Sequence, residues 1–271
     1  YDRALVEHTA EIVAIASDRA PPSCENVVVA LEKSGRLLTR VDSVFGNLAS
    51  SATNEDLQAI ELEMAPRLSA HWSAISMHPV LFARLDAVYQ QRETLGLDAE
   101  SLRVLERYHL DFVRAGAQLQ GASRDRLAEI AQRLAVLGTQ FSQNVLADEE
   151  NWILPLTDAQ MAGIPASIRD AAASKAAELK IEAPYAVTLS RSSAEPFLQY
   201  ADDRGCRETL YRAWVSRGDN ANDHNNKAII SEMLALRAER ATLLGHENFA
   251  AFKLADSMAG TPQKARALLE D

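Results

Sequence analysis

The chain has 271 residues, of which 47% are apolar and 24% are charged, and its formal net charge at pH 7 is −10. This balance is typical of a folded globular chain and excludes disordered and collagen-like polypeptides. Because no long Lys/Arg run offsets the acidic average and no apolar run approaches the roughly 18 residues that span a bilayer, we expect neither nucleic acid nor membrane as a partner.

Residues 1–150 are predicted to form an N-terminal helical bundle. The longest predicted helix runs from Ser123 to Ala147, since apolar residues recur there at steps of three and four opposite charged ones. Similar apolar stripes and the breaks between them follow in order: stripes at Val27–Leu38, Leu57–Trp72 and Leu102–Phe112, and breaks at Gly46–Asn54, Leu95–Asp98 and Gly121–Ser123. Long helices joined by short turns predict an antiparallel helical array.

Residues 151–200 are predicted to form a small β-containing insert. The runs Asn151–Leu156 and Tyr185–Leu189 are short, β-prone and bounded by turn-forming residues, and an Ala-rich helix is expected between them at Pro165–Lys180. These runs predict a two- or three-stranded sheet inside a mainly α protein.

Residues 201–271 are predicted to be a helical segment. A helix is expected from Asn222 to Leu244, and Gly245 is expected as its C-cap. Its predicted apolar side carries Ile230, Met233, Leu234, Ala241 and Leu244. A last helix begins well, with Thr261 as N-cap and Pro262 in its first turn, but shows no stop signal before Asp271. Since the chain also opens at Tyr1 rather than Met, both ends are interpreted as boundaries within a longer protein.

The histidines are the first candidates for hydrolytic chemistry, because imidazole serves as metal ligand and as general base. His246-Glu247 resembles the first half of an H-E-x-x-H zinc motif, but Ala250 occupies the second histidine position. Gly245 marks a helix end where that motif requires a helix interior, so we expect a polar loop that enters a helix at Asn248. The sequence therefore predicts no catalytic residue and no metal ligand in this segment, and substrate-binding residues stay unassigned.

The other histidines are predicted to be structural. His109 follows an apolar stripe and is expected to be a core histidine bonded to a neighbour, whereas His8 and His224 stand among polar residues and are expected to be exposed. His71 and His78 lie seven residues apart, but no carboxylate at matching spacing completes a ligand set.

The remaining serines, cysteines and carboxylates are also expected to have no catalytic role. Ser190, Ser192 and Ser193 have no local His or Asp partner, and Cys24 and Cys206 are predicted to be reduced, partly buried thiols. The carboxylate clusters Asp148-Glu149-Glu150 and Asp202-Asp203 border helix ends or turns and are expected to be solvated. Arg237 is predicted to be buried or half-buried and paired with Glu208 or Glu232.

A family resemblance is carried by stretches spread, in order, over nearly the whole chain: Asp111–Leu119, Arg126–Ile130, Phe141–Leu146, Tyr211–Asp219, Asn225–Glu232, Leu236–Gly245 and Lys253–Pro262. Together they resemble the thimet oligopeptidase family of zinc metallopeptidases, in its bacterial peptidyl-dipeptidase (dipeptidyl carboxypeptidase) branch. The resemblance implies a helix-rich ellipsoid split by a deep channel, with zinc held on the channel floor by H-E-x-x-H and a downstream Glu.

The resemblance also implies what this segment does. The full-length enzyme would use zinc to release C-terminal dipeptides from short unstructured peptides, and the zinc ligands would lie beyond Asp271. This segment is then an inactive N-terminal fragment that binds no zinc, forms one wall of the channel and has the C-terminal catalytic half as its partner. A cytoplasmic location is expected, with the periplasm as the alternative.

Three other interpretations stay open from the sequence. The fragment could belong to an oligopeptidase A-type endopeptidase, or the chain could be a self-contained α-helical interaction module. An independent hydrolase that uses His246 and Glu247 is the third, and it would need zinc bound through His246.

Overall fold

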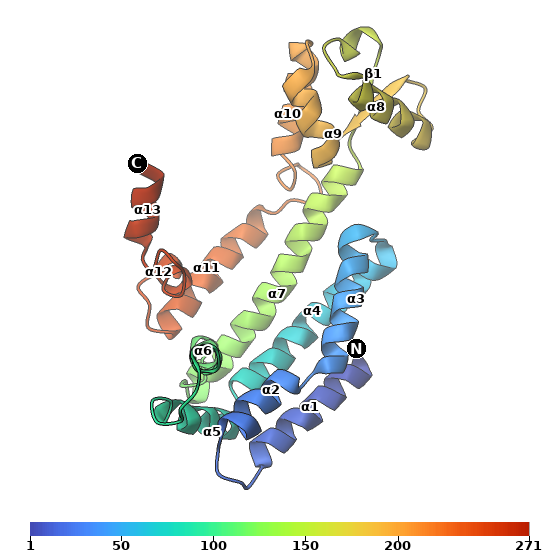
Figure 1. The fold of residues 1–271 in the computed structure, drawn as a ribbon. Helices are drawn as coiled ribbons and strands as arrows, with labels where there is room; N and C mark the ends of the chain where they lie inside the picture. The colour runs from blue at the N-terminus through green and yellow to red at the C-terminus, as the bar shows by residue number, and fades with distance from the viewer. Residues whose placement is uncertain (271) are drawn as a thin grey trace. The chain divides into compact units, whose positions relative to one another are not determined.

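The computed structural model describes residues 1–270, and the chain forms two compact units. Unit 1 comprises Tyr1–Leu137 and Met233–Asp271, of which Asp271 itself lies outside the described residues, and unit 2 comprises Gly138–Glu232. Both units are mainly helical, as predicted (Figure 1). The predicted three-part division at residues 150 and 200 stays a prediction.

Unit 1 is all helical. Its elements are α1 (Asp2–Ser17), the π-helix η1 (Cys24–Val29), α2 (Ala30–Lys33), α3 (Arg36–Ser51), α4 (Glu55–Ser76), α5 (Pro79–Gln90), α6 (Ala99–Arg114), α12 (Phe249–Leu254) and α13 (Pro262–Glu270). Two further helices have residues in both units, α7 (Gly121–Glu150) and α11 (Lys227–Leu243). α1 packs against α3 and α5, and α5 packs against α6. The core they enclose includes Val27, Leu81, Leu85 and Leu105, which are fully buried.

Several helices of unit 1 begin with a polar side chain that caps the first turn. Asp98 accepts a hydrogen bond from the Ser101 amide (2.7 Å), and Asn248 accepts one from the Ala251 amide (2.9 Å). The predicted long helix is present as α7, and the predicted cap at Thr261 begins α13 at Pro262. A short polar side chain thus satisfies amide donors that the helix itself cannot pair.

The predicted continuous stripe Val27–Leu38 is wrong, because the helix breaks at Ser34 and Gly35. Gly35 has φ +67°, and its amide donates to Glu11 Oε2 at 2.6 Å. A Cβ at this position would lie 2.8 Å from the His8 ring. The left-handed backbone and the close ring both require glycine here.

The predicted break Gly46–Asn54 is confirmed only in its last part, since α3 continues through Gly46 to Ser51 and Ala52–Asn54 separate it from α4. A Cβ at Gly46 would meet no atom within 4 Å, so this glycine is an exposed helical residue. A single glycine costs a helix only about 1 kcal/mol. The packing of α3 against α1 and α4 outweighs that preference.

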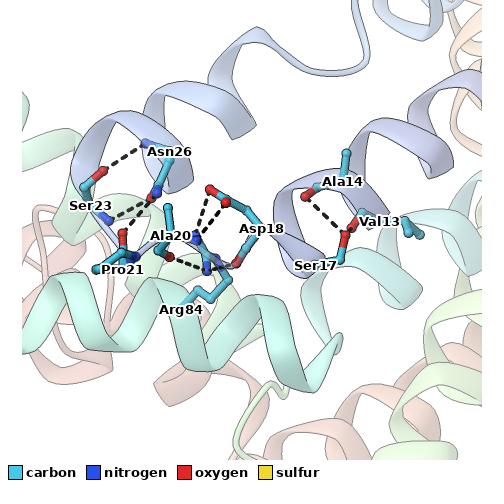
Figure 2. Close-up of polar contacts among 9 residues, drawn as sticks. All are labelled: Val13, Ala14, Ser17, Asp18, Ala20, Pro21, Ser23, Asn26 and Arg84. Atoms are coloured by element: carbon cyan, nitrogen blue, oxygen red, sulfur yellow. Dashed lines mark hydrogen bonds and ion pairs between the residues drawn. The ribbon is translucent and has the colours of Figure 1, made fainter.

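A buried arginine closes the connection between α1 and η1. Arg84 of α5, only 8% exposed, donates from Nη1 to the carbonyl oxygens of Asp18 (2.5 Å) and Ala20 (3.2 Å) and pairs with the Asp18 carboxylate at 3.4 Å (Figure 2). Just after this loop, the side chains of Ser23 and Asn26 bond reciprocally to each other's backbone amides (3.2 and 2.8 Å) and start η1. One side chain from a distant helix therefore fixes the loop through two of its carbonyl oxygens and one carboxylate.

Unit 2 holds the predicted sheet, which has two strands. Its elements are β1 (Ile153–Leu156), the 3₁₀ turn η2 (Ala159–Met161), α8 (Ala166–Glu178), β2 (Tyr185–Thr188), α9 (Arg191–Tyr200) and α10 (Arg204–Val215). β1 pairs antiparallel with β2, with Leu154 opposite Val187 and Pro155 opposite Ala186. α8 and α9 pack against β2, and Phe197 and Leu210 lie fully buried in the core beneath.

α11 starts five residues later than predicted, and only part of its predicted apolar face is buried. It begins at Lys227 rather than Asn222. It buries the predicted Ala241 together with Leu236, while Ile230 and Leu234 are 43% and 59% exposed. Its predicted C-cap is confirmed, since Gly245 has φ +78° and the His246 amide bonds the Ala241 carbonyl at 2.9 Å. Within residues 1–270, no helix is both long and apolar enough to span a membrane.

Candidate functional site

Four histidines of unit 1 have their side chains held by polar contacts: His109 and His78 each contact another residue type, and His8 and His71 contact each other. His109 is the predicted core histidine: its Nε2 lies 2.8 Å from Asp86 Oδ1, and its ring stacks on Tyr89 at 3.8 Å. His78 caps α5 by accepting from the Leu81 amide at 3.2 Å. The remaining two, His8 and His71, bond to each other with 2.9 Å between Nδ1 of His8 and Nε2 of His71.

The prediction that His8 is exposed is wrong, because His8 is only 3% exposed. It lies one helical turn from Ala4 and from Ile12, both buried, so it shares the core-facing stripe of α1. Gly35 leaves room for the ring, and Ser34 Oγ lies 3.2 Å from His8 Nε2. The helical periodicity of Ala4, His8 and Ile12 did indicate that His8 is buried, but the polar neighbours of His8 in the sequence led to the opposite prediction.

We expect the His8–His71 pair to make the stability of unit 1 pH-dependent. Burial lowers the pKa of His8, and burial followed by the charge of His8 lowers the pKa of His71; Glu11 opposes part of the effect on His8. Because the folded pKa values lie below the unfolded value of about 6.5, the unfolded chain binds protons first, and stability is lost as pH falls below that value. Urea unfolding followed between about pH 7.5 and pH 5.5 should therefore show a declining free energy of unfolding.

His71→Gln is the variant that checks this prediction, with His246→Gln as its matched control in the same unit. His71→Gln should flatten the decline, because it removes one of the two titrating rings. His246→Gln should leave the slope unchanged, since the His246 ring contacts Phe252 and not the pair. An equal slope in wild type and His71→Gln would show that the pair does not titrate as described.

His246 and Glu247 lie in the loop that the sequence predicted. Gly245 ends α11 and Asn248 caps α12, so neither residue is inside a helix. Across residues 1–270, no group of three or more His, Cys, Asp or Glu side chains is placed to hold a metal ion.

Asp148 is a buried carboxylate of unit 2, so the prediction that it is solvated is wrong. It is 7% exposed, at the end of α7, and its carboxylate accepts from the Gly218 amide (2.8 Å) and from the side-chain amides of Asn220 (2.7 Å) and Asn222 (2.8 Å). Burial alone would raise the pKa of Asp148, but these three hydrogen bonds, with the nearby His224, hold that pKa below its ordinary value. The carboxylate is thus a charged anchor for the loop between α10 and α11.

The same loop is tied to α7 at a second place. Asn226, 1% exposed, accepts from Asn144 Nδ2 at 2.9 Å and donates to the Phe141 carbonyl at 3.2 Å. Gly218 permits this approach, because it has φ +72° and a Cβ there would lie 2.6 Å from Asn226 Nδ2. The residues 216–226 are therefore held rigidly against the second half of α7.

The other predicted polar residues have structural partners. Asp203 caps α10 through the Cys206 amide (2.9 Å), and Cys24 and Cys206 are free thiols, half-buried and buried. Arg237 is half-buried as predicted, but its guanidinium lies over the Phe249 ring at 5.3 Å, and Glu208 pairs with Arg212.

A basic groove follows α9 and α10. It has a volume of about 600 Å³ and is lined by Leu198, Arg204, Arg207, Glu208, Tyr211, Arg212 and Val215. Two of its apolar side chains, Tyr211 and Val215, are 54% and 58% exposed. Three arginines and one glutamate line the groove, and the glutamate, Glu208, pairs with Arg212.

Comparison with known proteins places these features in a family. Residues 197–271, which include α10, the Asp148-bound loop and α11, match the sequence model of peptidase family M3. The chain is 38% identical over 266 residues to the dipeptidyl carboxypeptidase of Escherichia coli K12, which covers 98% of this chain and 39% of that protein. It is 33% identical over 274 residues to oligopeptidase A of Salmonella typhimurium LT2, which covers 99% of this chain and 40% of that protein.

The chain thus spans about two fifths of the length of these relatives. The similarity runs through both compact units, since the aligned part covers nearly all 271 residues. The resemblance noted from the sequence is confirmed, since residues 197–271 match peptidase family M3 and nearly the whole chain aligns with a dipeptidyl carboxypeptidase and an oligopeptidase A.

Proposed function

We propose that this chain is the N-terminal, substrate-excluding wall of a zinc-dependent peptidyl-dipeptidase that releases C-terminal dipeptides from short unstructured peptides. The observation that carries the proposal is the 38% identity to a dipeptidyl carboxypeptidase over 98% of the chain, against 33% to an oligopeptidase A. In this proposal the zinc and its ligands belong to sequence outside these 271 residues.

The donor groups of this chain do not fit a catalytic zinc ion. Such an ion takes three protein ligands and keeps one position open. The His8–His71 pair offers two nitrogens, and the other ring nitrogen of His8 faces Ser34. His246 lies in a loop between two helices and has no histidine partner at position 250. No step of peptide hydrolysis is therefore assigned to these residues.

In this proposal, the residues of this chain instead limit which substrates reach the active site of the whole enzyme. Large apolar side chains stand exposed on the part that matches the family: Tyr211, Val215, Ile230, Leu234, Met258, Leu268 and Leu269. Among these, Tyr211 and Val215 lie one turn apart on α10, and Leu268 and Leu269 adjoin each other on α13. Neighbouring exposed apolar side chains often mark a contact with another protein surface. We infer that these side chains contact the catalytic half. We also infer that the loop 216–226, which is bonded to α7, stabilises the conformation of the wall.

An oligopeptidase A-type endopeptidase is the second candidate, favoured by the 33% identity over 99% of the chain. The two activities differ in what they require of the substrate: removal of a C-terminal dipeptide requires a free terminal carboxylate near the cleaved bond, and internal cleavage does not.

The reading frame that follows the Asp271 codon tests the proposal. An H-E-x-x-H motif with a downstream Glu is expected there, whereas a stop codon at that point would favour a self-contained interaction module. The expressed product of the longer frame should release a dipeptide from a peptide with a free C-terminus and leave its C-amidated twin intact. Cleavage of both peptides would assign the endopeptidase activity instead.

A further inference from the structure

A cavity of about 480 Å³ in unit 1 lies between α1, α2, α4 and α6. Its wall combines aromatic rings and carboxylates, contributed by His8, Glu32, Trp72, Tyr108, Asp111 and Phe112. No lysine or arginine lines it. Its volume falls in the range of small-molecule sites, which are commonly apolar with a few convergent polar groups.

The polar groups of this cavity are held in place by neighbours. The Tyr108 hydroxyl donates to Glu32, and burial, reinforced by this hydrogen bond, raises the pKa of Tyr108 so that the hydroxyl keeps its proton. Asp111 Oδ1 accepts from Arg107 at 2.9 Å, but Arg107 also pairs with Asp256 at 2.5 Å. Arg107 is thus shared between two carboxylates, of which Asp256 also lies 3.8 Å from Arg114 Nε. Within residues 1–270, the only hydrogen-bond partner of Glu32 is the neutral Tyr108 hydroxyl.

The imidazole in the wall adds no positive charge at neutral pH. Burial lowers the pKa of His8, whose two ring nitrogens face Ser34 and His71. Next to it, Trp72 is 52% exposed, with its ring edge-on to His8 at 5.5 Å between centroids. A large aromatic ring left half in water beside carboxylates is an electrostatically negative surface, because the ring face carries negative potential.

We propose that this cavity binds a small aromatic amine in its protonated form. The ammonium group would lie between the Glu32 and Asp111 carboxylates and the rings of Trp72 and Tyr108, and the aromatic body would pack against Phe112. Carboxylates supply the charge attraction, and the aromatic faces supply the cation–π attraction that favours an organic cation over a hydrated metal ion. The proposal does not rest on the proposed peptidase function, because it is argued from the lining of the cavity in unit 1 alone.

The test uses 2-phenylethylammonium as ligand and Trp72 as reporter. The chain has three tryptophans, so Trp152→Phe with Trp214→Phe leaves Trp72 as the only one. Saturable fluorescence change is expected with 2-phenylethylammonium, at least roughly tenfold weaker binding with the neutral 2-phenylethanol, and none with the anionic 3-phenylpropionate. Equal binding of the ammonium and the alcohol, or no saturation with the ammonium, would overturn the proposal.

Glu32→Gln should weaken binding of 2-phenylethylammonium roughly tenfold, while Glu55→Gln, an exposed carboxylate of α4 outside the cavity, should leave it unchanged. Circular dichroism confirms that each variant is folded. If Glu32→Gln fails to fold, Trp72→Leu measured by calorimetry takes its place with the same expected weakening. Unchanged binding in a folded variant at either position would also overturn the proposal.

Discussion

Replacing Asp148 with alanine is expected to lower the free energy of unfolding of unit 2 by about 3–5 kcal/mol. The substitution removes the acceptor of three hydrogen bonds and leaves the buried Gly218 amide without a partner, together with the amides of the half-buried Asn220 and the exposed Asn222. Urea unfolding in a Trp72→Phe background measures this effect, because the two remaining tryptophans, Trp152 and Trp214, lie in unit 2.

Glu150→Ala is the matched control, since Glu150 lies two residues away on α7 and is exposed. Its effect should stay within about 0.5 kcal/mol. The pH dependence gives a second readout. Because the folded pKa of Asp148 lies below 3.8, its ordinary value, its contribution is complete above that pH and is lost as pH falls through the lower folded value. Asp148→Asn should remove this acid-dependent part, and an unchanged acid transition would refute the anchoring role.

Replacing Arg84 with methionine is expected to lower the free energy of unfolding of unit 1 by about 2–3 kcal/mol. Methionine keeps much of the apolar stem but leaves the carbonyl oxygens of Asp18 and Ala20 without their donor. The estimate stays at the lower end for a buried charge because Arg84 Nε is itself buried without a hydrogen-bond partner. Trp72 fluorescence in the Trp152→Phe, Trp214→Phe background reports on unit 1.

Arg19→Met is the control that separates the loss of the Arg84 contacts with Asp18 and Ala20 from the general loss of a positive charge near this loop. Arg19 lies between Asp18 and Ala20 in the sequence but is exposed, so its replacement should change stability by no more than about 0.5 kcal/mol. If the two arginine variants lost equal stability, the carbonyl contacts of Arg84 would not be what holds the loop.

Local patterns predicted the helices well because most of them bury one regular face. The α7 stripe with Leu127, Ile130 and Leu137 on its buried side is such a case. Errors arose where tertiary contacts outweighed local preference. The break expected to start at Gly46 starts only after Ser51, while Ser34 and Gly35 end a helix because Glu11 and His8 approach from α1.

The polar centres were harder to predict, since their partners are far apart in the chain. Asp148 is bonded by residues 70 to 74 positions away, and His8 meets a histidine 63 positions away. Nothing local distinguishes Asp148 from Glu150. The density of asparagines from Asn220 to Asn226, after a glycine, was the available hint that this loop needs a charged acceptor. Likewise, α11 exposes Leu234, so amphipathicity alone did not say which face is covered.

The most direct test of the account is zinc content measured together with peptide hydrolysis on this 271-residue chain. After incubation with zinc and gel filtration, the account predicts no stoichiometric metal and no dipeptide released from a peptide with a free C-terminus, because no described side chains assemble three ligands. Near-stoichiometric zinc with dipeptide release, both abolished in His246→Ala, would contradict it and place the reactive centre within these residues.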